Sequence, residues 1–257
     1  METTKIFNIN FNRITLKELI EEINNKVKNN KRIHIHTANV DHVVLANKNL
    51  KFKKVIEDAD IVVADGMPIV WSSKLIKNSI PERVTGVDLS YEICGKSNEY
   101  DFKIFLLGAA EGIAEKAKRN LLSKFPDLKI VDLYSPSPEE LLSIERNDEI
   151  LMRINSSGAN ILLVSLGTPK QEYWINENKE KLITNVNIGV GATIDFMAGE
   201  IDRAPLLLRN IGLEWFYRLL REPKRLFKRY IVNDSYFLII ILKEIWHYIS
   251  KRKEYMN

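Results

Sequence analysis

The sequence predicts an α/β fold, with a Rossmann-like, mainly parallel sheet that carries helices on both faces and a C-terminal helical appendage. Short β-branched apolar runs alternate with amphipathic helical segments through residues 1–200. This alternation is typical of consecutive βαβ units. After Gly199 the strand-like runs stop and helical patterns continue. We therefore expect two domains, a catalytic-type α/β domain over residues 1–200 and a helical domain over residues 201–257.

Continuous apolar runs predict the strands, because a strand of a parallel sheet is buried on both faces. In chain order the expected strands are 5–9, 32–37, 61–64, 103–107, 129–133, 160–165 and 185–190. Amphipathic segments between them predict the helices. The first begins after Thr15, which has capping-box spacing to Glu18. The others are expected at 40–47, 67–76, 87–96, 111–124, 138–156 and 169–181, and in the appendage at 205–221 and 223–250.

Composition favours a protein with a normal core and a basic tail. Hydrophobic residues make up 45% of the chain, and the single cysteine, Cys94, excludes an internal disulfide and a cysteine metal cluster. The net charge of +4 is unevenly distributed: from Arg203 onward there are 12 Lys/Arg against 5 Asp/Glu. A basic, aromatic tail on a mildly acidic body predicts an anionic surface or a polyphosphate as its partner, and we expect no nucleic acid.

No apolar run reaches the ~20 residues of a membrane span, and the first residues lack the pattern of a signal peptide. The tail instead combines apolar residues 236–242 with Trp246 and the basic run Lys251-Arg252-Lys253. This combination is typical of a helix that lies at a membrane interface. We expect a cytoplasmic protein that binds the inner face of the membrane peripherally; packing of the same segment on the body or on a second subunit is the alternative.

Asp65 is the first candidate for chemistry. It directly follows the apolar run Ile61–Ala64, and Pro68 is well placed to begin the next helix. Ligands of open α/β sheets bind at the carboxyl ends of the strands. A carboxylate there can act as a general base or hold a sugar hydroxyl. The alternative is an ordinary turn residue that caps the following helix.

Other polar or small residues also follow predicted strands. Thr37 and Asn39 follow the second strand, and Gly108-Ala109 begins a small-residue turn that could approach a phosphate. Lys170 and Gln171 stand in the first turn of a helix, where a bound anion would offset the unfavourable lysine. The turn Gly189–Asp195 could line the same crevice. Each of these also has a purely structural explanation in close packing, capping or solvation.

Two patterns in the sequence could suggest a metal site but do not support one. Asp58-Ala-Asp60 has the form of a metal-binding motif, but it precedes its strand and so lies at the wrong edge of the sheet. The four histidines lack the spacing of a metal site. His34 and His36 alternate on one strand and therefore share a face. We expect packed histidines and no bound metal.

Together the motifs resemble those of the WecG/TagA/CpsF family of bacterial glycosyltransferases, glycosyltransferase family 26, over about residues 5–230. The matching segments are Thr37-Ala-Asn39, Ala64-Asp65-Gly66, Pro81–Gly86, Leu107–Ala110, Leu166–Glu172, Gly189–Ala192, Arg203-Ala-Pro205 and Gly212–Arg218. The resemblance implies an inverting transferase that needs no metal or other cofactor. It also implies a UDP-sugar donor, an acceptor sugar on undecaprenyl diphosphate, and an appendage that helps close the site and meets the membrane.

The resemblance also implies roles for single residues. Asp65 matches the catalytic base, and Arg218 matches an appendage arginine that acts in the reaction. The matched substrate-binding positions are Thr37, Asn39, Arg83, Gln171 and Arg225. Further substrate-binding candidates are Gly108 and Ala109, from the small-residue turn, and Arg221, from its helical spacing to Arg218. Either Lys228 or Arg229 fills a third cation position of the appendage. Arg218, Arg221 and Arg225 would share one face only if the helix continued through Pro223.

The sequence leaves the sugar open. Transfer of N-acetylmannosamine to GlcNAc in teichoic acid or surface polysaccharide synthesis is the favoured hypothesis, and transfer of glucose or another hexose in exopolysaccharide assembly is the alternative. A nucleotide-dependent oxidoreductase remains a further alternative, because Asp132 lies near the spacing expected for a ribose-binding acid. A non-catalytic membrane-binding module would explain the tail but not the polar turns. The oligomeric state, including a homo-oligomer, is also open.

Overall fold

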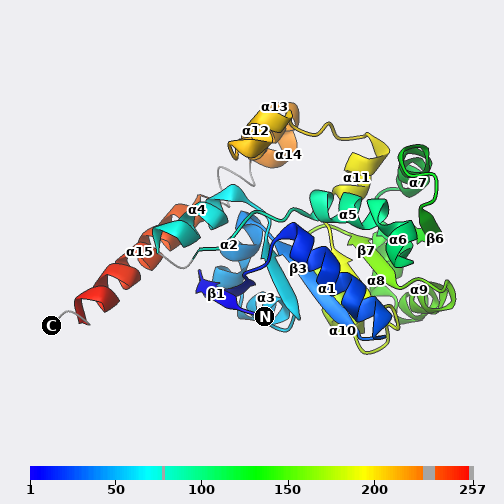
Figure 1. The fold of residues 1–257 in the computed structure, drawn as a ribbon, viewed down its shortest axis with the longest axis horizontal. Helices are drawn as coiled ribbons and strands as arrows, with labels where there is room; N and C mark the ends of the chain where they lie inside the picture. Colours follow the sequence, from blue (N-terminus) through cyan, green and yellow to red (C-terminus); the bar gives the residue numbers. More distant parts are fainter. Residues whose placement is uncertain (77–78, 228–234, 255–257) are drawn as a thin grey trace.

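The structure, a computed structural model, describes residues 1–76, 79–227 and 235–254 (Figure 1). Its centre is a six-stranded sheet with the order β4-β3-β8-β7-β5-β6, and every neighbouring pair is parallel. The strands are β3 (Ile33–Ala38), β4 (Ile61–Ala64), β5 (Lys103–Gly108), β6 (Lys129–Tyr134), β7 (Ile161–Ser165) and β8 (Val186–Gly189). The predicted parallel α/β architecture is confirmed.

Helices cover both faces of this sheet. One face packs against α1 (Leu16–Lys28), α5 (Gly86–Gly95), α7 (Ile113–Lys124) and α11 (Thr193–Ala198). The opposite face packs against α2 (Val40–Lys48), α3 (Leu50–Glu57), α9 (Ile144–Ser156) and α10 (Lys170–Asn178). The remaining helices of the body are α4 (Met67–Leu75), α6 (Ser97–Tyr100) and α8 (Pro138–Leu142). The capping box of Thr15 and Glu18 at α1 is confirmed.

The predicted first strand is wrong. Residues 5–9 do not form one strand but the turn of an antiparallel hairpin, β1 (Thr3–Ile6) and β2 (Ile9–Asn12). Phe7 and Asn8 reverse the chain with φ of 56° and 61°. Two consecutive left-handed residues form the tight turn that such hairpins need, and no glycine marks it. The predicted helix 138–156 is also broken, because Ser143 caps a new helix, α9.

The appendage is more segmented than predicted. It contains α12 (Leu206–Asn210), α13 (Glu214–Arg221), α14 (Pro223–Phe227) and α15 (Tyr236–Glu254). The expected continuous helix over 205–221 is wrong, because Gly212 turns the chain with φ of 75°. Within the expected helix over 223–250 the structure describes α14 and α15, and residues 228–234 between them fall outside the described residues. Since α13 ends before Pro223, Arg218 and Arg225 do not share one helix.

The long helix α15 packs against the hairpin and α2 with one face only. The Phe237 ring contacts the Phe7 ring edge-on at 5.0 Å, and the Phe7 N–H donates to Glu244 Oε2 at 3.0 Å. On the other face Leu238, Leu242 and Trp246 are 65–71% exposed. Of the helices in the described ranges, none is both long and apolar enough to cross a membrane.

Candidate active site

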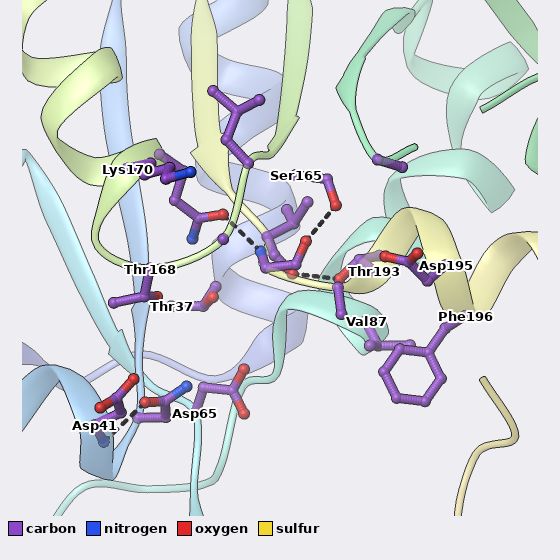
Figure 2. A pocket seen from close by; sticks show the side chains of 18 of the residues that line it. Thr37, Asp41, Asp65, Val87, Ser165, Thr168, Lys170, Thr193, Asp195 and Phe196 are labelled. Carbon is purple, nitrogen blue, oxygen red and sulfur yellow. Dashed lines mark hydrogen bonds between the residues drawn. The ribbon is translucent and has the colours of Figure 1, made fainter. Parts of the chain in front are cut away.

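A cavity of about 1500 Å³ opens at the carboxyl ends of the sheet strands. Its wall contains residues that directly follow β3, β4, β5, β7 and β8: Asn39, Asp65, Ala109, Leu166 and Val190. The appendage completes the wall with side chains from α13 and α15. Figure 2 shows Thr168 and Lys170 on one side of this pocket and Asp195 and Phe196 on another. The strand-end residues that the sequence singled out therefore do meet in space.

Asp65 is held at this edge by backbone groups. Its N–H donates to Ala38 O at 2.9 Å, and its Oδ2 accepts from the Gly86 N–H at 3.1 Å. Burial raises the pKa of Asp65 to about 6, against the lowering effects of the Gly86 N–H and of Arg83. The group is therefore a carboxylate at neutral pH, and a much better proton acceptor than an exposed aspartate.

The floor around Asp65 is closely packed and hydrogen-bonded. The Thr37 hydroxyl is buried and donates to Gly189 O at 3.1 Å. A Cβ at Gly86 would lie 3.0 Å from Val190 O and 3.2 Å from Thr37 Oγ1. A side chain at residue 86 would thus push the amide that holds Asp65 away from the turn after β8.

Asn39 and Gln171 lie at the cavity, but both side chains also bond within the protein. Asn39 caps α2, and its Oδ1 accepts from the Asp41 N–H at 3.0 Å. Gln171 is 1% exposed; its Oε1 accepts from the Gly191 N–H at 2.9 Å, and its Nε2 donates to Glu172 Oε1 at 2.6 Å. Gln171 therefore supports the turn after β8 in addition to lining the pocket.

Sequence reasoning missed the buried pair beneath these residues. His42 Nε2 lies 3.0 Å from Glu172 Oε1, and both side chains are almost fully buried. Burial acts to raise the pKa of Glu172, but the adjacent His42 outweighs it, so the pKa lies below its usual value. The two residues are 130 positions apart, and nothing in the local pattern of either segment pairs them.

Cations reach the site from the body, with Arg83, Arg153 and Lys170, and from the appendage, with Arg218. Arg83 Nη1 lies 2.9 Å from Glu214 Oε2 of α13, and Arg203 bonds Asp88 of α5 at 2.6 Å. Arg218 lines the cavity with its guanidinium carbon 5.3 Å from the centre of the Phe196 ring. Its ion pair with Glu222 is long, at 3.9 Å. The Arg218 Nε is buried without a hydrogen-bond partner among the described residues.

Three predicted binding residues are placed differently. Gly108, the last residue of β5, is outside the cavity wall, while Ala109 lines the pocket. With φ of 108°, Gly108 has a backbone conformation that favours glycine, and a Cβ there would collide with Ser165 O. Arg221 is 62% exposed, outside the wall, and pairs with Asp202 at 3.9 Å. Arg225 lies in α14. Lys228 and Arg229 fall outside the described residues.

The Asp58-x-Asp60 pattern lies at the opposite edge, as predicted. Asp58 ends α3, and Asp60 Oδ2 accepts from the N–H of His34 near the start of β3 at 2.8 Å. Within the described ranges no group of three or more His, Cys, Asp or Glu side chains could hold a metal ion. His36 is buried, and burial lowers its pKa to about 4. It is therefore a neutral, packed residue.

Comparison with known proteins identifies the family of the chain. The family model described as "Glycosyl transferase WecG/TagA/CpsF family" matches residues 4–251. The chain belongs to this family. It is therefore a glycosyltransferase, and the resemblance noted in its motifs is confirmed.

Among curated relatives, proteins of Staphylococcus aureus strains MW2 and NCTC 8325 / PS 47 are each 30% identical to this chain over 226 residues. The alignment covers 86% of this chain and 85% of the relative in both cases. Both are named N-acetylglucosaminyldiphosphoundecaprenol N-acetyl-beta-D-mannosaminyltransferase.

Proposed function

We propose that this glycosyltransferase moves N-acetylmannosamine from a UDP donor to the GlcNAc of an undecaprenyl-diphosphate-linked acceptor, with inversion and without a metal. The observation that carries the proposal is Asp65, a carboxylate of raised pKa at the carboxyl edge of a parallel sheet, inside a cavity of about 1500 Å³. The names of the Staphylococcus aureus relatives support this choice of sugar and acceptor.

A single displacement accounts for inversion with one carboxylate. Asp65 takes the proton of the acceptor hydroxyl while the hydroxyl oxygen forms its bond to the anomeric carbon. The bond from that carbon to the donor diphosphate breaks at the same time, and UDP leaves from the opposite face with the electron pair. No covalent glycosyl-enzyme is needed, so the chemistry requires no second carboxylate.

Charge that develops on the departing diphosphate needs cations or N–H donors nearby. Arg218 suits this role, because its buried Nε has no hydrogen-bond partner within the described ranges and its closest carboxylate is 3.9 Å away. Lys170 also lines the cavity. Asp132, the residue that kept an oxidoreductase open, is engaged by Arg153 through two bonds of 2.7 and 2.9 Å. That pairing disfavours a ribose-binding role.

The test is UDP release by the purified full chain with a panel of UDP-hexoses and a water-soluble GlcNAc-diphosphate-lipid analogue. We expect turnover with UDP-N-acetylmannosamine and equal rates in EDTA. A preference for UDP-glucose would contradict N-acetylmannosamine as the transferred sugar. Loss of activity in EDTA, with rescue by Mg²⁺ or Mn²⁺, would contradict the metal-free mechanism.

We also propose that α15 docks the enzyme on the anionic inner face of the cytoplasmic membrane. Its exposed face carries Leu238, Leu242 and Trp246, while Phe237 and Ile240 pack on the body. Deleting the helix would uncover that packing, so a surface substitution is the cleaner test. Trp246→Glu should lower binding to phosphatidylglycerol vesicles about tenfold, and Leu142→Glu, at an 86% exposed position of α8, should not. Equal binding by both variants would contradict the docking role.

A further inference from the structure

His42 lies at the cavity wall and Glu172 behind it, and neither side chain has a part in the proposed chemistry. Their side chains are 2% and 0% exposed, and the pair joins the start of α2 to the start of α10. A buried carboxylate is seldom a good source of stability, because its desolvation consumes most of what its partners contribute. The pair therefore calls for another explanation.

On the α2 side, the pair holds Asn39. His42 Nδ1 accepts from the Asn39 N–H at 3.3 Å and lies 3.0 Å from Asn39 Oδ1. On the other side of the ring, Nε2 lies 3.0 Å from Glu172 Oε1. The imidazole thus fixes the residue that directly follows β3 at the cavity edge.

On the α10 side, the pair holds Gln171 and through it the turn after β8. Glu172 Oε1 accepts from Gln171 Nε2 at 2.6 Å, and Gln171 Oε1 accepts from the Gly191 N–H at 2.9 Å. A Cβ at Gly189 would lie 3.0 Å from Gln171 Nε2. The carboxylate of Glu172 therefore selects the one orientation of the Gln171 amide that supports this turn.

The same turn touches the group that holds the base. Gly86 packs so closely on Val190 that a Cβ would lie 3.0 Å from Val190 O, and the Gly86 N–H is the donor to Asp65 Oδ2. A shift of the turn would move Gly86 and with it Asp65.

We propose that His42 and Glu172 are positioning residues for catalysis: they lock Asn39 and Gln171 and, through the Gly191 turn and Gly86, fix the orientation of Asp65. This rests on the proposed role of Asp65 as base. Neither residue is a catalytic residue in this scheme, since both act through others. Loss of the pair should lower kcat and leave KM nearly unchanged. A reacting group that is misplaced by a fraction of an ångström slows the chemical step, but the surface that binds the substrate remains.

A double substitution separates this role from a contribution to stability alone. In His42→Leu or Glu172→Met the remaining polar group stays buried and loses the partner that lay 3.0 Å away, so each single variant should be less stable. In the double variant His42→Leu/Glu172→Met both polar groups are gone, and most of that stability should return. Gln171 would still lack the acceptor that orients its amide. His36→Leu, another buried histidine in the sheet, is the matched control.

The experiment measures Tm, UDP affinity, kcat and KM for the wild type, the double variant, Glu172→Gln and the control. We expect the double variant to have a near-normal Tm and KM but a kcat lower by roughly 10- to 30-fold. In Glu172→Gln the amide oxygen replaces Glu172 Oε1 as the partner of His42 Nε2 and Gln171 Nε2, so kcat should stay within about threefold of wild type. The control should also remain within about twofold.

Recovery of kcat together with Tm in the double variant would overturn the positioning role. If that variant does not fold, Gln171→Met is the substitute: it removes the bond from the Gly191 N–H and leaves His42 and Glu172 in place. A normal kcat in Gln171→Met would also contradict the positioning role. Hydrogen exchange of the Gly191 amide tests the bond to Gln171 without a measurement of activity, and we expect it to be faster in either variant than in wild type. Failure of the proposed function shows separately, as absence of turnover in the wild type or as full activity in Asp65→Asn.

Discussion

Asp65 and Arg218 reach the same cavity from two regions that are held in different ways. Asp65 belongs to the sheet, where its neighbours are fixed by buried hydrogen bonds and by glycine contacts such as that of Gly86 with Val190. Arg218 belongs to α13 of the appendage, and near this helix ion pairs of Arg83 with Glu214 and of Arg203 with Asp88 join the appendage to the body.

This difference separates the two halves of the proposed reaction. A base must keep one orientation toward the hydroxyl it deprotonates, and the close-packed sheet provides that. A cation that neutralises a leaving diphosphate has to release it after each turnover. Ion pairs that are partly exposed, as these are, are more sensitive to salt than buried hydrogen bonds. A bound diphosphate can therefore compete with Glu214 for Arg83.

The largest effect should come from the sheet. Asp65→Asn preserves the shape and the bond from Gly86 but cannot accept the proton, so kcat should fall by about 10²–10⁴-fold with UDP affinity little changed. The wild-type rate should also decline below about pH 6, where the buried Asp65 becomes protonated. Near-normal turnover in the variant would place the base elsewhere, and Asp195 would be the next residue to test.

The appendage should give the next effect, and it should be confined to the cavity side of α13. Arg218→Ala removes a charge that lines the cavity, and we expect kcat to fall by roughly 10- to 100-fold with vesicle binding unchanged. Arg221→Ala is the matched control on the same helix, at a side chain that is 62% exposed and outside the cavity wall. Equal losses in both variants would remove the distinction between the two arginines.

The sheet should also show a stability cost that the appendage lacks. Burial raises the folded-state pKa of Asp65 above its ordinary 3.8 to about 6, so ionisation favours the unfolded state. This penalty is absent below about pH 3.8, grows up to pH 6 and is complete above it. Asp65→Asn should therefore be more stable than wild type by about 1–2 kcal/mol at pH 7.5 and equal to it at pH 3.5. Urea unfolding at both pH values measures this, and a less stable variant at pH 7.5 would contradict the burial.

The smallest effect should come from the contact between the regions. Glu214→Gln keeps the size of the side chain but weakens its attraction for Arg83, which is 2.9 Å away. We expect kcat/KM to change by about threefold at low salt and by less at 0.5 M NaCl, because salt already screens the wild-type pair. An effect as large as that of Arg218→Ala would mean that Glu214 takes part in the reaction.

The sequence predicted the parts of the fold that depend on local patterns. The apolar run before Asp65 is a strand, and the carboxylate lies at its carboxyl end, because a short β-branched stretch has few other stable environments. The turn of Phe7 and Asn8 was not predictable, since both residues adopt positive φ without a glycine. Gly212 and Pro223 are residues that often interrupt a helix, but whether they do so here depends on how the short helices on either side pack.

The site was predictable as a set of strand ends and not as a network. Parallel strands bring Thr37, Asn39 and Asp65 together whatever lies between them. The commitment of Gln171 to Gly191 and of His42 to Glu172 required two segments 20 and 130 residues apart to meet. The sequence also does not distinguish Arg218 from Arg221 as a residue of the cavity. Only the packing of α13 shows that Arg218 lines the cavity and that Arg221 is exposed.

The contact of Phe7 with α15 has a consequence for the order of folding. Phe7 and Glu244 are 237 residues apart in the chain, so their contact closes a very long loop and gains nothing until the intervening sheet has formed. The helix therefore docks last and, by the same reasoning, is the first element to detach in local unfolding. Because Phe237 and Leu238 of this helix also line the cavity, detachment opens one wall of the active site while the sheet and its base stay intact.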